Sequence, residues 1–207
     1  MRKKLSKDFY LRPDVLVIAR DLLGKVLVTE SAGIRCAGRI VETEAYNGEA
    51  DKASHAWGGR RTSRTEVMYA TGGVAYVYLC YGIHHLFNVV TNSRDIPHAV
   101  LIRALEPLEG LDLMLKRTGK NKVDESLTRG PGNAAKAMGI TTAMTGTSLL
   151  GRTVYIADDG YRPAATDITA GPRIGVDYAG ADALLPYRFY IKGHPNLSGS
   201  KSTNNLS

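Results

Sequence analysis

The feature that most constrains the fold is a series of strand-like segments along the first half of the chain. Two long segments lie between Lys25 and Tyr46 and are separated by the turn residues Ser31-Ala32-Gly33. Further segments of this kind follow at Val74–Tyr81, Leu86–Thr91 and Ala99–Glu106. Strands that follow one another in this way pair most simply as neighbours of opposite direction. The pattern therefore predicts a mainly antiparallel sheet.

Helical patterns flank these strands. Apolar residues recur at helical spacing in Asp14–Leu23, with Gly24 as the stop. Two later segments suit short helices, Leu108–Arg117 and Pro131–Met138, and two suit strands, Thr153–Ala157 and Arg188–Lys192. No internal repeat or linker divides the chain. The sequence predicts the α+β class, with helices flanking the sheet of a single mixed domain.

Length and composition set the extent of this domain. The chain has 207 residues, of which 43% are hydrophobic and 23% charged, which excludes a wholly disordered chain. We expect one domain over residues 8–195 and a flexible or loosely docked tail over residues 196–207, because this tail offers almost nothing apolar to bury. The longest mainly apolar run, Val74–Tyr81, is far short of the roughly 20 residues that cross a bilayer. With no apolar stretch near the N-terminus, we expect a cytoplasmic protein without a membrane partner.

The charge balance is moderately basic. The chain has 27 Lys and Arg against 20 Asp and Glu, a formal net charge of +7. Arg60, Arg61 and Arg64 cluster within Asn47–Gly73, a long polar segment that we expect to line a site. These arginines are candidates for contacts with a DNA backbone. Charge alone leaves a nucleic-acid partner and an ordinary solvated face equally open.

Three polar residues alternate at the end of the second strand. The period of a strand places Glu42, Glu44 and Tyr46 on one face, so that two carboxylates and an aromatic ring share a surface. A polar face turned toward solvent is the commoner explanation of such a pattern. Both explanations remain open at this point.

Tyrosine dominates the aromatic residues, with 11 Tyr against three Phe and one Trp. Several tyrosines, among them Tyr76, Tyr78 and Tyr81, lie close together in the sequence. Tyrosine rings suit stacking on a planar heterocycle, and the hydroxyl can meet a polar partner. Half-buried sheet positions also favour tyrosine, and the residues alone favour that explanation.

Arg103 lies in the middle of an apolar strand-like segment, VLIRALEPLEG. A guanidinium there must reach solvent or meet a carboxylate or phosphate. We expect Arg103 to pair with Glu44. The alternative is an ion pair that serves the fold and no reaction.

Several sequence blocks occur together and in order between about Arg39 and Gly193. They are VETEAY followed by His55 and Gly-Gly-Arg, YVYLCYG followed by Asn88, VLIRALEPLEG, PRIGV and PYRFYIKG. With these blocks the chain resembles the alkyladenine (3-methyladenine) DNA glycosylase family of the vertebrate type. The resemblance implies a curved sheet with a β-hairpin that inserts into DNA. It also implies base excision repair of alkylated or deaminated purines, namely 3-methyladenine, 7-methylguanine, hypoxanthine and ethenoadenine.

The resemblance also implies catalytic roles. Glu44 corresponds to the general base that deprotonates the attacking water. Arg103 and the main-chain carbonyl of Ile174 correspond to the groups that hold this water. Tyr81, at the tip of a hairpin, corresponds to the wedge that enters the duplex.

The pocket for the flipped base is implied in the same way. Tyr46 would stack on one side of the base, with His55 and Tyr78 on the other. Asn88 corresponds to the side chain that clashes with the exocyclic amine of normal guanine.

No cofactor or metal is expected, because the five histidines lack the spacing of a ligand set. Without a lysine on the predicted face, direct attack by water is simpler than a Schiff base, so we expect a monofunctional enzyme. Its partner would be double-stranded DNA with damaged purines. We expect a monomer, associated with the nucleoid if bacterial. Two alternatives remain, a non-catalytic nucleic-acid-binding domain and a nucleoside hydrolase.

Overall fold

The long strand β3 (Ile34–Tyr46) organises the sheet, because it pairs with β2 (Val26–Ser31), β6 (His98–Glu109) and β9 (Arg188–Ile191). The computed structural model describes residues 2–31 and 33–199. The remaining strands there are β1 (Lys3–Lys4), β4 (Val74–Cys80), β5 (His84–Thr91), β7 (Val154–Asp158) and β8 (Ile168–Gly171). The main order is β1-β7-β2-β3-β6-β5-β4, with β9 and β8 joined to β3. All strand pairs among the described residues are antiparallel, which confirms the prediction.

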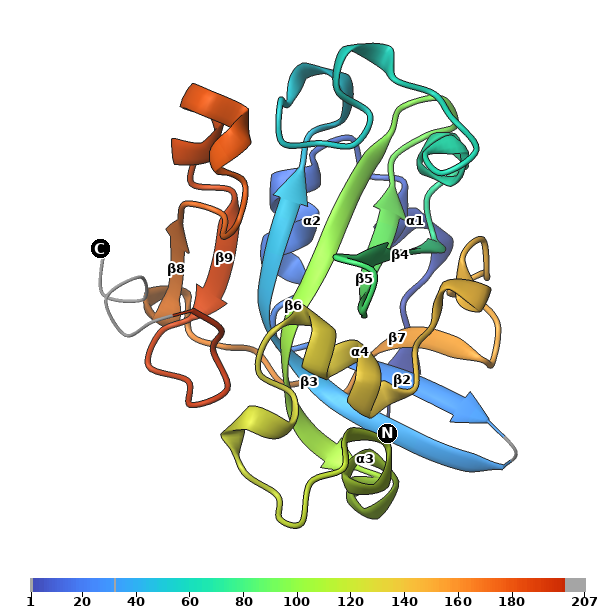
Figure 1. Cartoon of the computed structure of the whole chain (residues 1–207), viewed down its shortest axis with the longest axis vertical. Coiled ribbons are helices and arrows are strands. Elements are labelled where there is room, and N and C mark those ends of the chain that lie inside the picture. The colour runs from blue at the N-terminus through green and yellow to red at the C-terminus, as the bar shows by residue number, and fades with distance from the viewer. Residues whose placement is uncertain (1, 32, 200–207) are drawn as a thin grey trace.

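β3 changes its partner part-way along. Residues 34–39 of β3 face β2 along six register pairs, whereas Glu42–Glu44 face β9. On its other edge the register against β6 shifts near Ile40 and again beside Glu42. Irregularities of this kind bend a strand and increase its twist. The sheet accordingly curls into the half-barrel seen in Figure 1.

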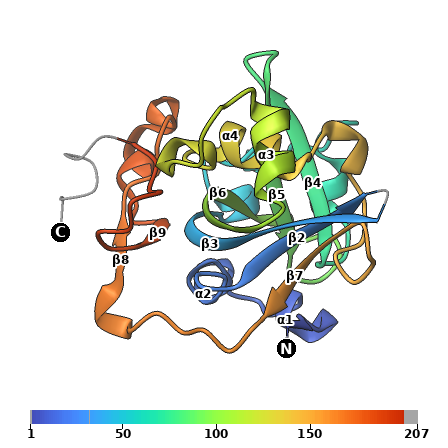
Figure 2. The ribbon, with the colours of Figure 1, turned by 90° about the horizontal axis from the view of Figure 1, so that it is seen from below.

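The helices lie on both sides of this sheet. They are α1 (Lys7–Tyr10), α2 (Val15–Asp21), α3 (Leu111–Thr118) and α4 (Pro131–Met138). Figure 2 shows α2 below the sheet, and α3 and α4 above it. The Asp14 side chain accepts hydrogen bonds from the Leu16 and Val17 N–H groups, which defines the start of α2. None of the helices in the described ranges has the length and hydropathy needed to cross a bilayer.

Seven short 3₁₀ helices complete the described secondary structure: η1 (Gly48–Ala50), η2 (Trp57–Gly59), η3 (Glu66–Tyr69), η4 (Glu125–Leu127), η5 (Thr142–Met144), η6 (Ala165–Asp167) and η7 (Asp177–Leu184). The first three lie in Asn47–Gly73, the polar segment that was expected to line a site. They give this segment a folded backbone without a strand.

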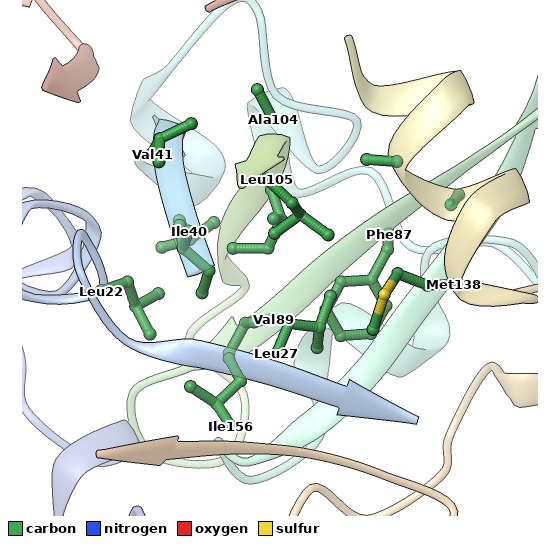
Figure 3. Close-up of a cluster of buried hydrophobic side chains, with 14 of the residues drawn as sticks. Leu22, Leu27, Ile40, Val41, Phe87, Val89, Ala104, Leu105, Met138 and Ile156 are labelled. Carbon is green, nitrogen blue, oxygen red and sulfur yellow. The ribbon is translucent and has the colours of Figure 1, made fainter. Parts of the chain in front are cut away.

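The main core fills the space between the sheet and the helices. Met138 of α4 lies beside Phe87 of β5, and Leu105 of β6 lies near Ile40 of β3 in Figure 3. These side chains are at most 2% exposed. Their burial supplies the apolar driving force that holds α4 on the sheet.

Most predicted elements are present, with shifted ends. The helix at Pro131–Met138 has the predicted bounds, whereas β6 extends to Glu109, so α3 begins only at Leu111. Gly110 makes this switch, since its φ of 81° is a left-handed conformation that glycine adopts without strain. The short strand β8 was not predicted.

The expectation of a loose tail from Asn196 is wrong for the residues that the structure describes. Asn196, Leu197 and Ser198 are buried. The Leu197 side chain joins the main core cluster, and Asn196 Nδ2 donates to the Glu125 carbonyl at 3.0 Å. A single apolar residue and a few polar partners therefore suffice to dock this segment. Residues 200–207 of the predicted tail lie outside the described residues.

We predict that Leu197→Ala lowers the free energy of unfolding by about 2–5 kcal/mol, since Leu197 is 5% exposed and joins the core. Urea unfolding at neutral pH measures this change. Leu184→Ala is the matched control, because Leu184 is 76% exposed and its truncation should change stability by less than about 0.5 kcal/mol. Equal effects of the two substitutions would show that the C-terminal segment is not docked.

Candidate active site

A cavity of about 550 Å³ opens beside the sheet where β3, β4, β5 and β6 come together. Eight of the residues singled out from the sequence line it: Tyr46, His55, Arg64, Tyr78, Tyr81, Asn88, Arg103 and Ile174. The cavity therefore gathers side chains that are up to about 130 positions apart in the chain, as between Tyr46 and Ile174. Its lining combines aromatic rings with arginine, histidine and asparagine side chains, which suits a flat ligand that also carries polar groups.

Glu44 lies directly beneath this cavity and is fully buried. Its Oε1 accepts a hydrogen bond from the Ile174 N–H at 2.7 Å and forms an ion pair with Arg103 Nη1 at 3.1 Å. Its Oε2 accepts a hydrogen bond from the Tyr46 hydroxyl at 2.9 Å. All three partners line the cavity. The Glu44 carboxylate is thus held next to the cavity by groups that themselves line the cavity.

The predicted pairing of Arg103 with Glu44 is confirmed. The shared face of Glu42, Glu44 and Tyr46 is also confirmed, because Arg103 contacts both carboxylates and Tyr46 contacts Glu44. The alternative of a solvent-facing polar strand is wrong. β3 lies between β6 and β9 at Glu42–Glu44, so both of its edges and this face are covered.

Ile174 reaches Glu44 through its main-chain N–H. The sequence resemblance had implied a role for its carbonyl oxygen, which stays a prediction. The segment is anchored by Arg173, which pairs with both Asp51 oxygens and donates to the Ala45 carbonyl at 2.9 Å. This buried ion pair, together with the bond to Ala45, holds the PRIGV segment beside the end of β3. Neither Arg173 nor Asp51 was identified from the sequence, because they are 122 residues apart.

Aromatic rings form one wall of the cavity. The His55 and Tyr78 rings meet edge to face with centroids 4.7 Å apart, and His55 Nδ1 is 2.8 Å from the Tyr76 hydroxyl. Burial lowers the pKa of His55 to about 4, and the positive charges of Arg64 and Arg60 act in the same direction. His55 is therefore neutral at physiological pH. Tyr76 belongs to the tyrosine group noted in the sequence, although no role was assigned to it.

Tyr46 supplies another part of the cavity lining. Burial, and next the negative charge of Glu44, raise the pKa of Tyr46 well above its ordinary value. Its hydroxyl therefore stays protonated and donates a hydrogen bond to Glu44 Oε2. One ring thus connects the cavity to the buried carboxylate.

Asn88 lies on β5 and is buried at the cavity wall. Its Nδ2 donates to the main-chain carbonyls of Tyr76 at 3.2 Å and Leu86 at 3.4 Å. These bonds fix the side-chain amide against β4 and β5. Asn88 is therefore a rigid part of the lining.

The tip of the β4–β5 hairpin presents an aromatic ring to solvent. Tyr81 is 88% exposed and also lines the rim of the cavity. Tyr81 and Gly82 have φ angles of 50° and 73°, and the Ile83 N–H donates to the Cys80 carbonyl at 3.1 Å. Two consecutive left-handed residues are typical of the tight turns that match the twist of a hairpin. The turn therefore holds the Tyr81 ring out from a rigid base.

The three clustered arginines differ in their surroundings. Arg61 is paired with Glu66 at 2.7 Å and Asp95 at 2.8 Å. The Arg64 guanidinium lies 5.0 Å from the centre of the Tyr78 ring and lines the cavity, whereas Arg60 does not line it, and both arginines are exposed. Contacts of these arginines with a DNA backbone stay a prediction, and the charge of Arg61 is already compensated.

Other cavity residues were missed in the sequence. Tyr178 lines the cavity and its hydroxyl donates to the Ala53 carbonyl at 3.0 Å. Arg129 and the first residues of α4 also line it. Arg129 and the first residues of α4 have an ordinary sequence for the start of a helix, so only the fold shows that they line the cavity. In the part of the chain that the structure describes, no three His, Cys, Asp or Glu residues gather as a metal site would require.

Removing a base from DNA requires a slot that accepts the base and a carboxylate close to the sugar. The cavity and the buried Glu44 next to it fit this requirement, and sequence similarity to known enzymes shows the chain to be of the DNA glycosylase class, a hydrolase of N-glycosyl bonds. A sequence profile of the methylpurine-DNA glycosylase family matches residues 8–195. The chain belongs to this family.

Bacterial relatives match nearly the whole chain. A protein of Chlamydia abortus is 48% identical over 188 residues, which cover 90% of this chain and 97% of the relative. A protein of Desulfitobacterium hafniense is 44% identical over 203 residues, covering 95% and 98%. A protein of Bacillus cereus is 47% identical over 194 residues, covering 89% and 94%. Each carries the name "Putative 3-methyladenine DNA glycosylase".

We predict that His55 makes folding stability depend on pH. Its pKa is about 4 in the folded protein and near 6.5 when unfolded, so below pH 6.5 the unfolded chain binds a proton that the folded protein excludes. Between pH 7 and pH 5 this difference should remove about 2 kcal/mol of stability.

Urea unfolding of the wild type and His55→Gln at both pH values measures this contribution. His55→Gln should lose about 2 kcal/mol less than the wild type between pH 7 and pH 5. The exposed His84→Gln is the control and should retain the wild-type loss. Identical losses in all three proteins would contradict a buried, neutral His55.

Proposed function

We propose that the chain is a monofunctional DNA glycosylase that removes alkylated or deaminated purines from duplex DNA. Its substrates would be 3-methyladenine, 7-methylguanine, hypoxanthine and ethenoadenine, and its product an abasic site. The observation that carries the proposal is the buried Glu44 carboxylate, held beneath the aromatic cavity by Tyr46, Arg103 and Ile174. The names of the bacterial relatives agree with the first of these substrates.

The first step is extrusion of the damaged nucleotide. A base inside a duplex cannot offer its glycosidic bond to a group on the protein, and turning it out costs a few kcal/mol. Tyr81 is suited to fill the vacated space, because its exposed ring projects from a tight turn at the cavity rim. Stacking between this ring and the neighbouring bases would offset part of the cost.

The second step is selection of the base in the cavity. Purines alkylated at a ring nitrogen are cationic, and aromatic faces such as those of Tyr46 and Tyr78 attract a cation by about 0.5–2 kcal/mol. A neutral His55 adds no repulsion toward such a base. Asn88, fixed by its bonds to two carbonyls, is suited to exclude the exocyclic amine of guanine.

The third step is hydrolysis. A water positioned by Arg103 and Glu44 forms a bond from its oxygen to the sugar C1′, while the C1′–N bond breaks and its electron pair leaves with the base. A cationic alkylated purine leaves as a neutral molecule, whereas a neutral base such as hypoxanthine leaves as an anion that takes up a proton from solvent. The proton of the water passes to Glu44. The carboxylate also stabilises the positive charge that develops on the sugar. No lysine is among the described cavity residues, which supports direct attack by water over a Schiff-base route.

Two other functions predict different behaviour. A non-catalytic nucleic-acid-binding domain would use the aromatic rings for stacking and would not need Glu44. A nucleoside hydrolase would have no use for an exposed Tyr81 at the cavity rim. We therefore favour the DNA glycosylase. We further propose that it acts as a monomer on chromosomal DNA, which in a bacterium means in the cytoplasm at the nucleoid.

We predict that Glu44→Gln slows base release by about 100-fold or more, because glutamine cannot accept the proton of the water. A duplex that contains hypoxanthine or 3-methyladenine is incubated with each protein under single-turnover conditions. Free base and an alkali-labile abasic site should form with the wild type and the control Glu30→Gln, whose carboxylate pairs with Arg35 on the protein surface. Base release at the wild-type rate by Glu44→Gln would rule out this mechanism.

We predict that Tyr81→Ser slows release from a duplex by about tenfold or more, because the variant lacks the ring that occupies the vacated space. On a single-stranded or bulged substrate, where little unstacking is needed, the loss should be less than about threefold. Rates on the two substrates are compared in parallel. An equal loss on both substrates would remove the wedge assignment and leave the hydrolytic one intact.

A further inference from the structure

A second buried carboxylate lies behind Glu44. Glu42 is on the same face of β3 and is fully buried. Its Oε1 accepts bonds from Arg103 Nε and Arg188 Nη1, both at 3.1 Å. Two carboxylates and two guanidinium groups therefore form a neutral buried cluster, which is the condition under which charges are tolerated in a protein interior.

Ser198 joins this cluster from the far end of the chain. Its N–H donates to Glu42 Oε2 at 2.7 Å, and its hydroxyl donates to Glu42 Oε1 at 2.8 Å. The same hydroxyl oxygen accepts bonds from Arg103 Nε at 3.1 Å and Arg103 Nη2 at 3.0 Å. A hydroxyl can donate one bond and accept two, so these three bonds lie within its capacity.

Arg103 is consequently held from two sides. Nη1 faces Glu44, while Nε and Nη2 face Glu42 and Ser198. The guanidinium is planar and rigid, so contacts on one edge fix the direction of the opposite edge. The contacts of Nε and Nη2 with Glu42 and Ser198 therefore determine where Nη1 meets the Glu44 carboxylate.

The segment that carries Ser198 is docked by its own contacts. Arg129 Nη2 donates to the Pro195 carbonyl at 2.9 Å, and Asn196 Nδ2 donates to the Glu125 carbonyl at 3.0 Å. Leu197 is buried in the main core. These contacts place Ser198 independently of its bonds to Arg103.

We propose that Ser198 and Glu42 are positioning residues that set the orientation of Arg103 toward Glu44, so that the C-terminal segment completes the catalytic site. The part of the proposal that concerns rate rests on the proposed glycosylase function. The part that concerns the Arg103 side chain does not. The competing explanation is that the cluster stabilises the fold and leaves the reaction untouched.

The test variant is Ser198→Ala, which removes the hydroxyl and keeps the main-chain N–H that bonds Glu42. Ser198→Thr restores a hydroxyl as the conservative variant. Thr29→Val is the matched control, since it deletes a buried hydroxyl bonded to the Met138 carbonyl at 2.7 Å, outside the site. A Glu42→Gln variant is less informative, because it leaves two buried guanidinium groups with reduced compensation and can fail to fold.

The direct readout is the crystal structure of Ser198→Ala, together with the NMR signal of Arg103 Nε–H. We expect the guanidinium to rotate and the Arg103 Nη1 to Glu44 Oε1 distance to lengthen beyond hydrogen-bond reach. An Arg103 that keeps its wild-type position and signal would overturn the proposal.

The second readout is the single-turnover rate of base release at saturating enzyme, with the dissociation constant for the damaged duplex measured separately. We expect Ser198→Ala to be about tenfold slower with unchanged DNA affinity, as a misplaced catalytic group lowers the rate of the chemical step. Ser198→Thr and Thr29→Val should keep the wild-type rate.

The two readouts separate the two proposals. An active wild type with an equally fast Ser198→Ala would overturn the positioning role and leave the glycosylase function standing. A wild type that releases no base would overturn the proposed function, and the position of Arg103 in Ser198→Ala would then decide the inference on its own.

Discussion

The rest of the site depends on one buried cluster of charges, in which Arg103 lies between Glu42 and Glu44. Removing such groups from water is costly unless every charge is paired and hydrogen-bonded. Arg188 balances the second carboxylate and also donates to the Pro172 carbonyl at 3.0 Å. The cluster therefore explains why four distant parts of the chain converge here: β3, β6, β9 and the segment that carries Ser198.

The curl of the sheet makes this convergence possible. Because β3 exchanges β2 for β9 as its partner, its second half turns away from the flatter part of the sheet and carries Glu44 and Tyr46 to the cavity. The β4–β5 hairpin closes the same cavity from the other edge and bears Tyr81 at its tip. Figure 1 shows this hairpin and the β8–β9 unit on opposite sides of the long strand β6. One sheet thus brings together the residues that we propose for base recognition and for bond cleavage.

The sequence predicted the ion pair between Arg103 and Glu44 better than its surroundings. A lone arginine in an apolar strand must find a carboxylate, and this argument identified the Arg103–Glu44 pair, which is confirmed. The same argument could not identify Glu42 as a second partner, because a strand with Glu42 and Glu44 on one face is equally compatible with solvent exposure. The tail was misjudged for a related reason. Composition does not reveal that Leu197 packs into the main core or that the Ser198 hydroxyl bonds to Arg103.

The sequence by itself determined most of the strands, their antiparallel pairing, the bounds of α4 and the motifs by which the chain resembles its family. Each of these follows from local periodicity, from turn residues or from an ordered set of motifs, which a linear chain displays directly. Only the tertiary structure decided that Glu44 is buried next to the cavity, that Arg173 anchors PRIGV through Asp51 and that Ser198 reaches Arg103. These contacts join residues about 95 to 130 positions apart, and their partners are chosen by packing in three dimensions.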